Sequence, residues 1–369
     1  MTADFLGQNL RLARLFHGLS LQDLADRVNK SKQYLSRLES GLEPPHENLE
    51  TALAEALDVL PRFFREVDPM PISDEQCHFR KQLTTKVALK QVARAQGELF
   101  KRLVSVLDQN LEFPNYDFLH EEVSTPEEIE RVAEISRSHW GLGLGPIANM
   151  SRVAENAGAV LVKTDGLADE IDAISFATRR PVITLNAEGK SACRTRFGIA
   201  HEIGHLTIHV GVQTGDRATE SQANRFASAF LMPRAYFIKE CQKALRGTRL
   251  NWQALSDIKM RWGVSKAAIL YRGRQLGVFS EEQYRSGVIT LRRHGEALQE
   301  HEDRDMVQEK PEVIFDSMKV LAEQCGMSRK MIADLMFVKP ELIDKLVGVK
   351  ADESIHNNIV SLQYHRSLN

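Results

Sequence analysis

The sequence lacks the features that would place it outside the class of cytoplasmic globular proteins. Its 369 residues include only four cysteines, and no two of them have a CxxC spacing. A disulfide framework and a cysteine-built zinc site are therefore not expected. No apolar run approaches the roughly 20 residues that span a bilayer, and the first residues lack the basic, apolar and small-residue order of a secretion signal. We expect a cytoplasmic protein with no membrane partner.

An excess of one charge is also missing. The chain has 48 lysines and arginines against 50 aspartates and glutamates, for a net charge of -2. A global attraction to nucleic acid is therefore excluded, and any contact with DNA must come from a local surface. The composition, 43% hydrophobic and 27% charged, is that of a globular protein. At this length the chain is expected to form two or three domains.

The densest chemical signal is the stretch RFGIAHEIGHLTIH from residue 196 to 209. If it is a helix, His201 and His205 lie on one face about 6 Å apart along the axis and can hold a divalent metal. Glu202 then projects beside the open position of the metal, where it can take a proton from water. A helix with two histidines hydrogen-bonded inside a core is the alternative.

A second helix, ESQANRFASAFLMP, comes after a short connection and ends at Pro233. Glu220 opens this helix and offers an anionic oxygen as a third ligand, which leaves a fourth position for water. Asn224 lies one turn later on the same face. Its side-chain carbonyl can accept a ring N–H from a ligating histidine and fix the tautomer.

The first 66 residues have the pattern of four or five short helices. Ser20 is expected to cap the second helix. A three-residue turn from Asn29 to Ser31 leads into the third helix, KQYLSRLESG. Two short helices joined by a tight turn form the geometry that presents a recognition helix to the major groove.

This segment resembles the Xre-type helix-turn-helix of phage and bacterial repressors, although Leu21 stands where that family often has glutamine and Asn29 where it has glycine. The resemblance implies a double-stranded DNA operator as partner, read by one face of the third helix. The residues it places on that face are Ser31, Lys32, Gln33, Tyr34, Ser36 and Arg37. A helical interaction domain that no longer binds DNA is the alternative, because acids roughly balance the local basic residues.

The stretch from Ala192 to Pro233 resembles the ImmA/IrrE-type metallopeptidases, and the similarity continues through LSDIKMRWGVSKAAILYRGRQLG. The resemblance covers roughly the middle 150 residues, and many relatives carry an Xre-type domain in front. It implies Zn²⁺ as cofactor, with a gluzincin-like HExxH centre. Residue by residue, it implies that His201, His205 and Glu220 bind zinc and that Glu202 is the general base and acid.

Two further roles at this centre are open in the sequence. His209, Tyr236 and Arg217 are the candidates for a group that stabilises the oxyanion of peptide hydrolysis. The sequence does not choose between them, and a core or solvated side chain is the simpler interpretation of His209. Cys193 can in principle supply a thiolate to the metal, although a buried filler side chain is the simpler role.

Between these two regions the sequence predicts a turn-rich linker, DPMPISD, and a long helix from Gln82 to Phe113. The apolar stripe of this helix must be covered, either by its own chain or by a second subunit, so a homodimer is open. A capping box of Ser124 and Glu127 is expected to open the next helix. Three strands come next, AVLVKT, DAISFAT and PVITLNA, of which the last two form a hairpin whose edge can bind an extended peptide.

The expected fold is multidomain and mainly α, with a small α+β metallopeptidase domain, an all-α helix-turn-helix domain at the N-terminus and a helical bundle at the C-terminus. The charged interlude RRHGEALQEHEDRDMVQEKPE is expected to be a solvated loop or linker. The helices after Val313 only vaguely resemble a second helix-turn-helix, and a dimerisation or regulatory role is the more modest expectation. The expected divisions are 1–66 helix-turn-helix, 67–123 linker and long helix, 124–278 peptidase and 279–369 C-terminal region.

Together these features predict a transcriptional regulator that binds an operator and uses zinc to cleave a partner repressor, releasing a stress, mobile-element or defence operon. The main alternative is a non-proteolytic, autoregulating repressor or antitoxin-like protein that uses the metal fold for structure or sensing. Replacement of Glu202 separates them, since a structural site tolerates it and a peptidase does not. A protein-interaction scaffold without metal is a third, weaker alternative.

Overall fold

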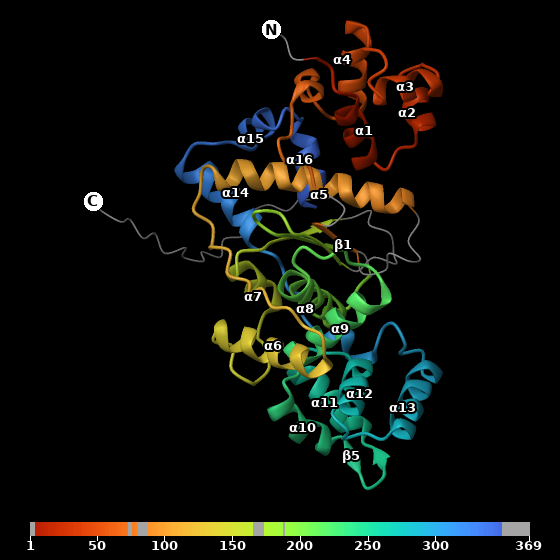
Figure 1. The fold of residues 1–369 in the computed structure, drawn as a ribbon, viewed down its shortest axis with the longest axis vertical. Coiled ribbons are helices and arrows are strands. Elements are labelled where there is room, and N and C mark those ends of the chain that lie inside the picture. Colours follow the sequence, from red (N-terminus) through yellow and green to blue (C-terminus); the bar gives the residue numbers. More distant parts are fainter. Residues whose placement is uncertain (1–3, 73–75, 80–86, 165–172, 187–188, 349–369) are drawn as a thin grey trace, which may run out of the picture.

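The computed structural model describes residues 4–72, 76–79, 87–164, 173–186 and 189–348. The fold is mainly helical with a small mixed sheet, as the sequence predicts. In Figure 1 the N-terminal helices lie at one end, the long helix α5 crosses between them and the sheet, α8 and α9 lie beyond the sheet, and α10–α13 form the other end. None of the described helices combines the length and the apolar character needed to cross a bilayer.

The N-terminal unit contains the predicted short helices, which confirms the pattern in the sequence. Ser20 forms a capping box with Asp23, and Asn29 adopts a left-handed conformation with φ of 51° in the turn before the third helix. Asparagine tolerates this conformation, so the turn forms without glycine. The elements are α1 (Gly7–Phe16), α2 (Leu21–Arg27), α3 (Lys32–Glu39), α4 (Glu47–Ala56) and the 3-10 helix η1 (Pro61–Arg65).

The long helix α5 spans Val87–Asp108, shorter than the predicted Gln82–Phe113, whose first residues lie outside the described part of the chain. Leu99, Leu103 and Leu107 of its apolar stripe are fully buried in a core built by this chain. Coverage by the same chain is therefore the observed arrangement. Gly97 permits α5 to pack closely on the sheet, because a Cβ at this position would lie 2.3 Å from the ring of Phe176.

The sheet has the order β1-β3-β4-β2. The predicted hairpin is confirmed, since β3 (Ala173–Phe176) pairs antiparallel with β4 (Val182–Asn186), while β2 (Val160–Thr164) pairs parallel with β4. The sequence did not predict β1 (Cys77–Phe79), which pairs antiparallel with β3. The predicted edge strand of the hairpin therefore already has a neighbour on its outer side.

Both faces of the sheet are covered, and alternate residues along the strands belong to different cores. Ile174 and Phe176 belong to the core that contains α5 and the N-terminal helices, whereas Ala173, Ile183 and Leu185 belong to the core that contains α8 and α9. Burial on both sides explains why the strands are almost continuously apolar. The sheet thus separates the N-terminal helices from the candidate metal centre.

The helix that begins at Pro126 is capped one residue later than predicted. Thr125, not Ser124, caps α6 (Pro126–His139) and forms the capping box with Glu128, so the expected pair of Ser124 and Glu127 is wrong. The remaining elements of this half are α7 (Met150–Asn156), α8 (Ala192–Ile208), α9 (Arg217–Leu231), α10 (Arg234–Lys243), β5 (Leu245–Arg246), β6 (Arg249–Leu250), α11 (Trp252–Trp262), α12 (Lys266–Gln275) and α13 (Glu281–Arg293).

The charged segment after α13 is largely exposed, as its composition predicts, but it is anchored to the core from Glu300 onward. It contains the 3-10 helix η3 (His301–Asp305), and Glu300 is only 5% exposed. The ammonium group of Lys259, on α11, lies 2.6 Å from Glu300 and 2.5 Å from Asp303. Further along, Glu309 pairs with Arg196 of α8. Acids that have buried cationic partners hold this segment against the core.

The C-terminal helices return to the N-terminal half. They are α14 (Val313–Gln324), α15 (Arg329–Leu335) and α16 (Pro340–Val347), a small bundle as predicted, and their apolar faces join the core around α5. The Leu60 amide donates to Phe337 and the Lys339 amide donates to Asp58, both at 2.8 Å. The expected domain boundaries stay predictions, and residues 349–369 lie outside the described part.

Candidate metal centre and DNA-facing helix

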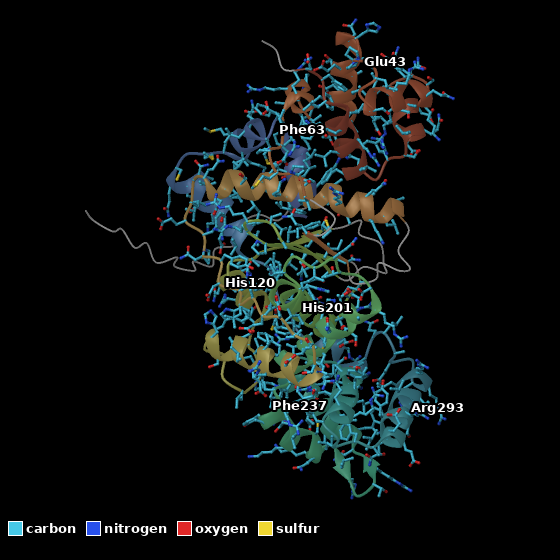
Figure 2. All side chains as sticks on the ribbon, viewed as in Figure 1. Glu43, Phe63, His120, His201, Phe237 and Arg293 are labelled. Carbon is cyan, nitrogen blue, oxygen red and sulfur yellow. The ribbon has the colours of Figure 1, made fainter. Side chains whose placement is uncertain are left out.

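The helix α8 places the HExxH residues in the interior. Ser191 caps it by accepting from the Arg194 amide, and apolar residues surround it on several sides. His201 and Glu202 are 0% exposed, and His205 is 1% exposed. Figure 2 shows His201 near the middle of the molecule, between the sheet and α9. Buried polar groups require partners, and their partners define the site.

The helix α9 supplies the third side chain. Asp216 caps α9 by accepting from the amides of Ala218 and Thr219. Gly204, inside the HExxH motif, lets α9 pack closely on α8, because a Cβ at this position would lie 3.1 Å from the ring of Phe226. This packing brings Glu220, in the first turn of α9, to the two histidines of α8.

The three donor atoms have the spacing of a metal's ligands. The Nε2 atoms of His201 and His205 lie 3.1 Å apart, and each lies 3.3 Å from one carboxylate oxygen of Glu220. Ligands about 2.0–2.1 Å from a tetrahedral zinc ion are separated from one another by about 3.3 Å. Among the described residues, these three form the one group of histidine, cysteine and acidic side chains suited to hold a metal ion.

Hydrogen bonds at the far sides of the rings determine which nitrogens carry protons. The Asn224 side-chain oxygen lies 3.1 Å from Nδ1 of His201, so this nitrogen donates and Nε2 carries a lone pair. The Gln222 side-chain oxygen accepts from Nε2 of His209 at 2.9 Å, which leaves Nδ1 of His209 to accept from Nδ1 of His205, also at 2.9 Å. Nε2 of His205 then carries a lone pair as well.

Two lone pairs and a carboxylate therefore face one another in a buried space. Neither oxygen of Glu220 makes a hydrogen bond within the described part of the chain. An anion and two lone pairs at these distances repel one another unless a cation lies between them, so the residues fit a divalent metal.

Glu202, the candidate base, is held by a residue that the sequence patterns did not single out. The Ser175 hydroxyl, on β3, donates to Oε2 of Glu202 at 2.6 Å. A lone serine in an apolar strand gave no signal in the sequence, since its partner is 27 residues away. Gln222 was also missed, because a residue two positions after Glu220 on a helix does not share a face with that ligand.

The structure gives different environments to the other candidate side chains. His209 is 3% exposed and bonded to His205 and Gln222, so its ring is part of the support of the ligand histidines. Tyr236, on α10, lies against Trp262, and Arg217 is exposed at the start of α9. Burial raises the pKa of the Cys193 thiol to about 12, and its sulfur lies 3.3 Å from that of Met306, as fits a filler side chain.

The DNA-facing residues predicted from the sequence lie on or next to α3. Ser31 is the N-cap and accepts from the Tyr34 amide at 3.2 Å, while Tyr34 packs partly against the core. Arg37 is exposed, lies over the Tyr34 ring and pairs with Glu43 at 2.9 Å. Lys32, Gln33 and Ser36 are exposed. The outer face of α3 is thus open to solvent, at the end of the molecule away from the metal centre (Figure 1).

Comparisons with known proteins identify two domains. Residues 6–62 match the helix-turn-helix domain family. Residues 154–273 match the IrrE N-terminal-like domain, a peptidase family, and this range includes the three candidate metal ligands and Glu202. The chain therefore combines a helix-turn-helix domain with an IrrE-like metallopeptidase domain, as the resemblance in its sequence indicated. No curated protein matches it.

One solved structure with a similar region is a Mycobacterium tuberculosis transcriptional regulator. The similarity covers 46% of this chain and 51% of that one, with 16% sequence identity and a TM-score of 0.29. The present chain thus spans about half the length of that regulator.

Proposed function

We propose that this chain, which joins a helix-turn-helix domain to an IrrE N-terminal-like domain, is a cytoplasmic, DNA-binding regulator that cleaves a partner repressor with a zinc centre. Cleavage would release an operon for stress, mobile-element or defence functions. The single observation that carries the proposal is the arrangement of two histidine Nε2 atoms and one carboxylate, 3.1–3.3 Å apart, beside a buried glutamate.

In this proposal His201, His205 and Glu220 hold the metal. A Zn²⁺ ion bound there supplies a Lewis acid that polarises a carbonyl group and lowers the pKa of water toward neutrality. Asn224 fixes the tautomer of His201, and His209, itself fixed by Gln222, fixes the tautomer of His205. The support of each ligand by a further hydrogen bond preserves the geometry of the site.

Glu202 acts as the general base and acid. It removes a proton from the attacking water and transfers it to the leaving amine when the peptide bond breaks. The hydroxyl of Ser175 holds one carboxylate oxygen and so fixes the orientation of the carboxylate. The apolar residues around α8 limit the access of bulk water, which strengthens the electrostatic interactions inside the site.

A DNA-binding domain on the same chain supports a regulatory protein as substrate. A peptidase for general turnover has no need of an operator, whereas a chain that binds an operator is concentrated beside the proteins that regulate it. The exposed face of α3 and its basic residues Lys32 and Arg37 support contacts with phosphates or base edges.

The decisive experiment compares wild-type protein with the Glu202→Gln variant. Both are loaded with zinc and incubated with the repressor encoded beside the gene, and new termini are identified by mass spectrometry. We expect one specific cut with the wild type, none with the variant, and equal zinc content and operator binding in both. Cleavage by Glu202→Gln at the wild-type rate would contradict the mechanism, and no cleavage by either protein would favour a non-proteolytic regulator.

A further inference from the structure

The outer edge of β3 lies beside the candidate catalytic glutamate. Ser175 is in β3 and bonds to Glu202, so β3 is the strand of the sheet that directly contacts the base. In the order β1-β3-β4-β2, β3 would be the edge strand of the described sheet if β1 were absent. The backbone groups along that edge are taken by Cys77–Phe79 of the same chain.

The pairing register places the middle residue of β1 opposite the serine that contacts Glu202. Cys77 pairs with Phe176, His78 with Ser175 and Phe79 with Ile174, so the middle residue of β1 is directly opposite the serine that holds Glu202. The Ala177 amide donates to the Gln76 carbonyl at 2.9 Å. Hydrogen-bonded and non-hydrogen-bonded pairs alternate in an antiparallel ladder, so His78 and Ser175 form the next hydrogen-bonded pair and Cys77 and Phe176 do not.

An extended peptide binds a sheet edge through the same backbone hydrogen bonds that β1 makes. Only three residues of β1 pair with β3, and each backbone hydrogen bond contributes a modest net free energy. A peptide that makes the same pairs with β3 and is also bound by the metal centre can therefore replace β1. Both strands cannot occupy the edge at once, because neighbouring strands are separated by only about 4.8 Å.

We infer that β1 occupies the position that a substrate peptide takes on β3, so that an extended peptide must displace residues 77–79 before it reaches Glu202. The inference rests on the proposed metal centre and peptidase function, because it assigns β1 to the position of the substrate beside Glu202. β1 and the substrate compete for the edge of β3. The substrate that fits this edge is an extended polypeptide segment with unpaired backbone amides, and β1 weakens the binding of every such segment. In the chain, β1 lies between η1 and α5. Displacement of β1 therefore breaks the pairing by which the segment after the N-terminal helices is attached to the sheet.

Substitution of His78 tests this competition in the zinc-loaded, full-length chain. His78→Pro removes the amide that pairs with Ser175, whereas His78→Ala removes the side chain and keeps the amide. The probes are acetohydroxamate, which binds a metal without pairing with a strand, and an N-blocked trileucine hydroxamate, which does both. We expect His78→Pro to bind the peptide hydroxamate about tenfold more tightly than the wild type or His78→Ala, and all three to bind acetohydroxamate equally.

A second variant changes the competition in the opposite direction. Phe176→Cys places a thiol opposite Cys77 in a non-hydrogen-bonded pair, where the short separation of the two residues permits a disulfide. The oxidised protein locks β1 onto β3, and the same protein reduced with a phosphine is the control, since both forms lack the Phe176 ring. We expect the oxidised form to bind the peptide hydroxamate at least tenfold more weakly than the reduced form.

The two probes separate the possible failures. Equal affinities of the peptide hydroxamate for the oxidised and reduced forms, with normal binding of acetohydroxamate, would overturn the role of β1 and leave the metal centre intact. If acetohydroxamate binds none of the zinc-treated proteins, the proposed metal centre is wrong, and the role of β1 is overturned with it.

Discussion

The candidate metal centre and the predicted DNA-facing helix differ in how much of their geometry is fixed by contacts within the chain. At the centre, His201, Glu202 and His205 are at most 1% exposed, and each has a defined partner within the fold. On α3, Lys32 and Gln33 are exposed. Chemistry on a peptide bond requires fixed donors before the substrate arrives, whereas long, flexible side chains adjust to DNA as it binds.

The largest expected effect is the loss of the metal. His205→Ala removes one ligand, and we expect the zinc content to fall from about one ion per chain to almost none, with loss of cleavage. Operator binding should be unchanged, because α3 lies on the other side of the sheet. The control is His294→Ala, an exposed histidine at the end of α13. Mass spectrometry of bound metal measures the effect, and a full complement of zinc in His205→Ala would remove this residue from the ligand set.

A smaller effect is expected at the residue that positions the base. Ser175→Ala leaves the ligands in place but releases one oxygen of Glu202, so we expect kcat to fall about 10- to 100-fold with KM and zinc content unchanged. Thr184→Val is the matched control, since it removes a buried hydroxyl from the neighbouring strand that makes no hydrogen bond in the described structure. Steady-state kinetics of repressor cleavage measures the effect, and an unchanged kcat would show that Ser175 does not position Glu202.

The smallest effect is expected on the exposed helix. Lys32→Ala removes one cation from the DNA-facing surface, so operator affinity should fall about five- to tenfold and the salt dependence should weaken by about one counterion. Cleavage and zinc content should be unchanged. Lys330→Ala, an exposed lysine on α15, is the control. Fluorescence anisotropy at several salt concentrations gives both values, and equal affinities for the two variants would contradict the assigned face of α3.

Local patterns in the sequence predicted most of the fold. The spacing of His201 and His205, the cap at Ser20 and the hairpin of β3 and β4 all depend on residues that are close in the chain. The cap of α6 was wrong by one residue because Ser124 and Thr125 are both suitable caps and acids come after both.

Contacts between distant residues could not be predicted from the sequence. β1 contains only three residues, and its partner strand lies about a hundred residues later, so no periodicity marked it. The acids after α13 resembled a solvated loop because their partner, Lys259, is 41 residues away from Glu300. At the metal centre, the ligand motif was visible in the sequence, whereas Ser175 and Gln222 depended on packing between elements.

X-ray absorption at the zinc edge tests the central claim most directly. For the purified protein loaded with one equivalent of zinc, we predict a first shell of nitrogen and oxygen atoms only, at about 2.0–2.2 Å, with the scattering pattern of two imidazoles. His201→Ala should lose one imidazole or the ion itself. A sulfur atom at about 2.3 Å, or a zinc ion without imidazole ligands, would contradict the assignment of His201, His205 and Glu220 as the metal centre.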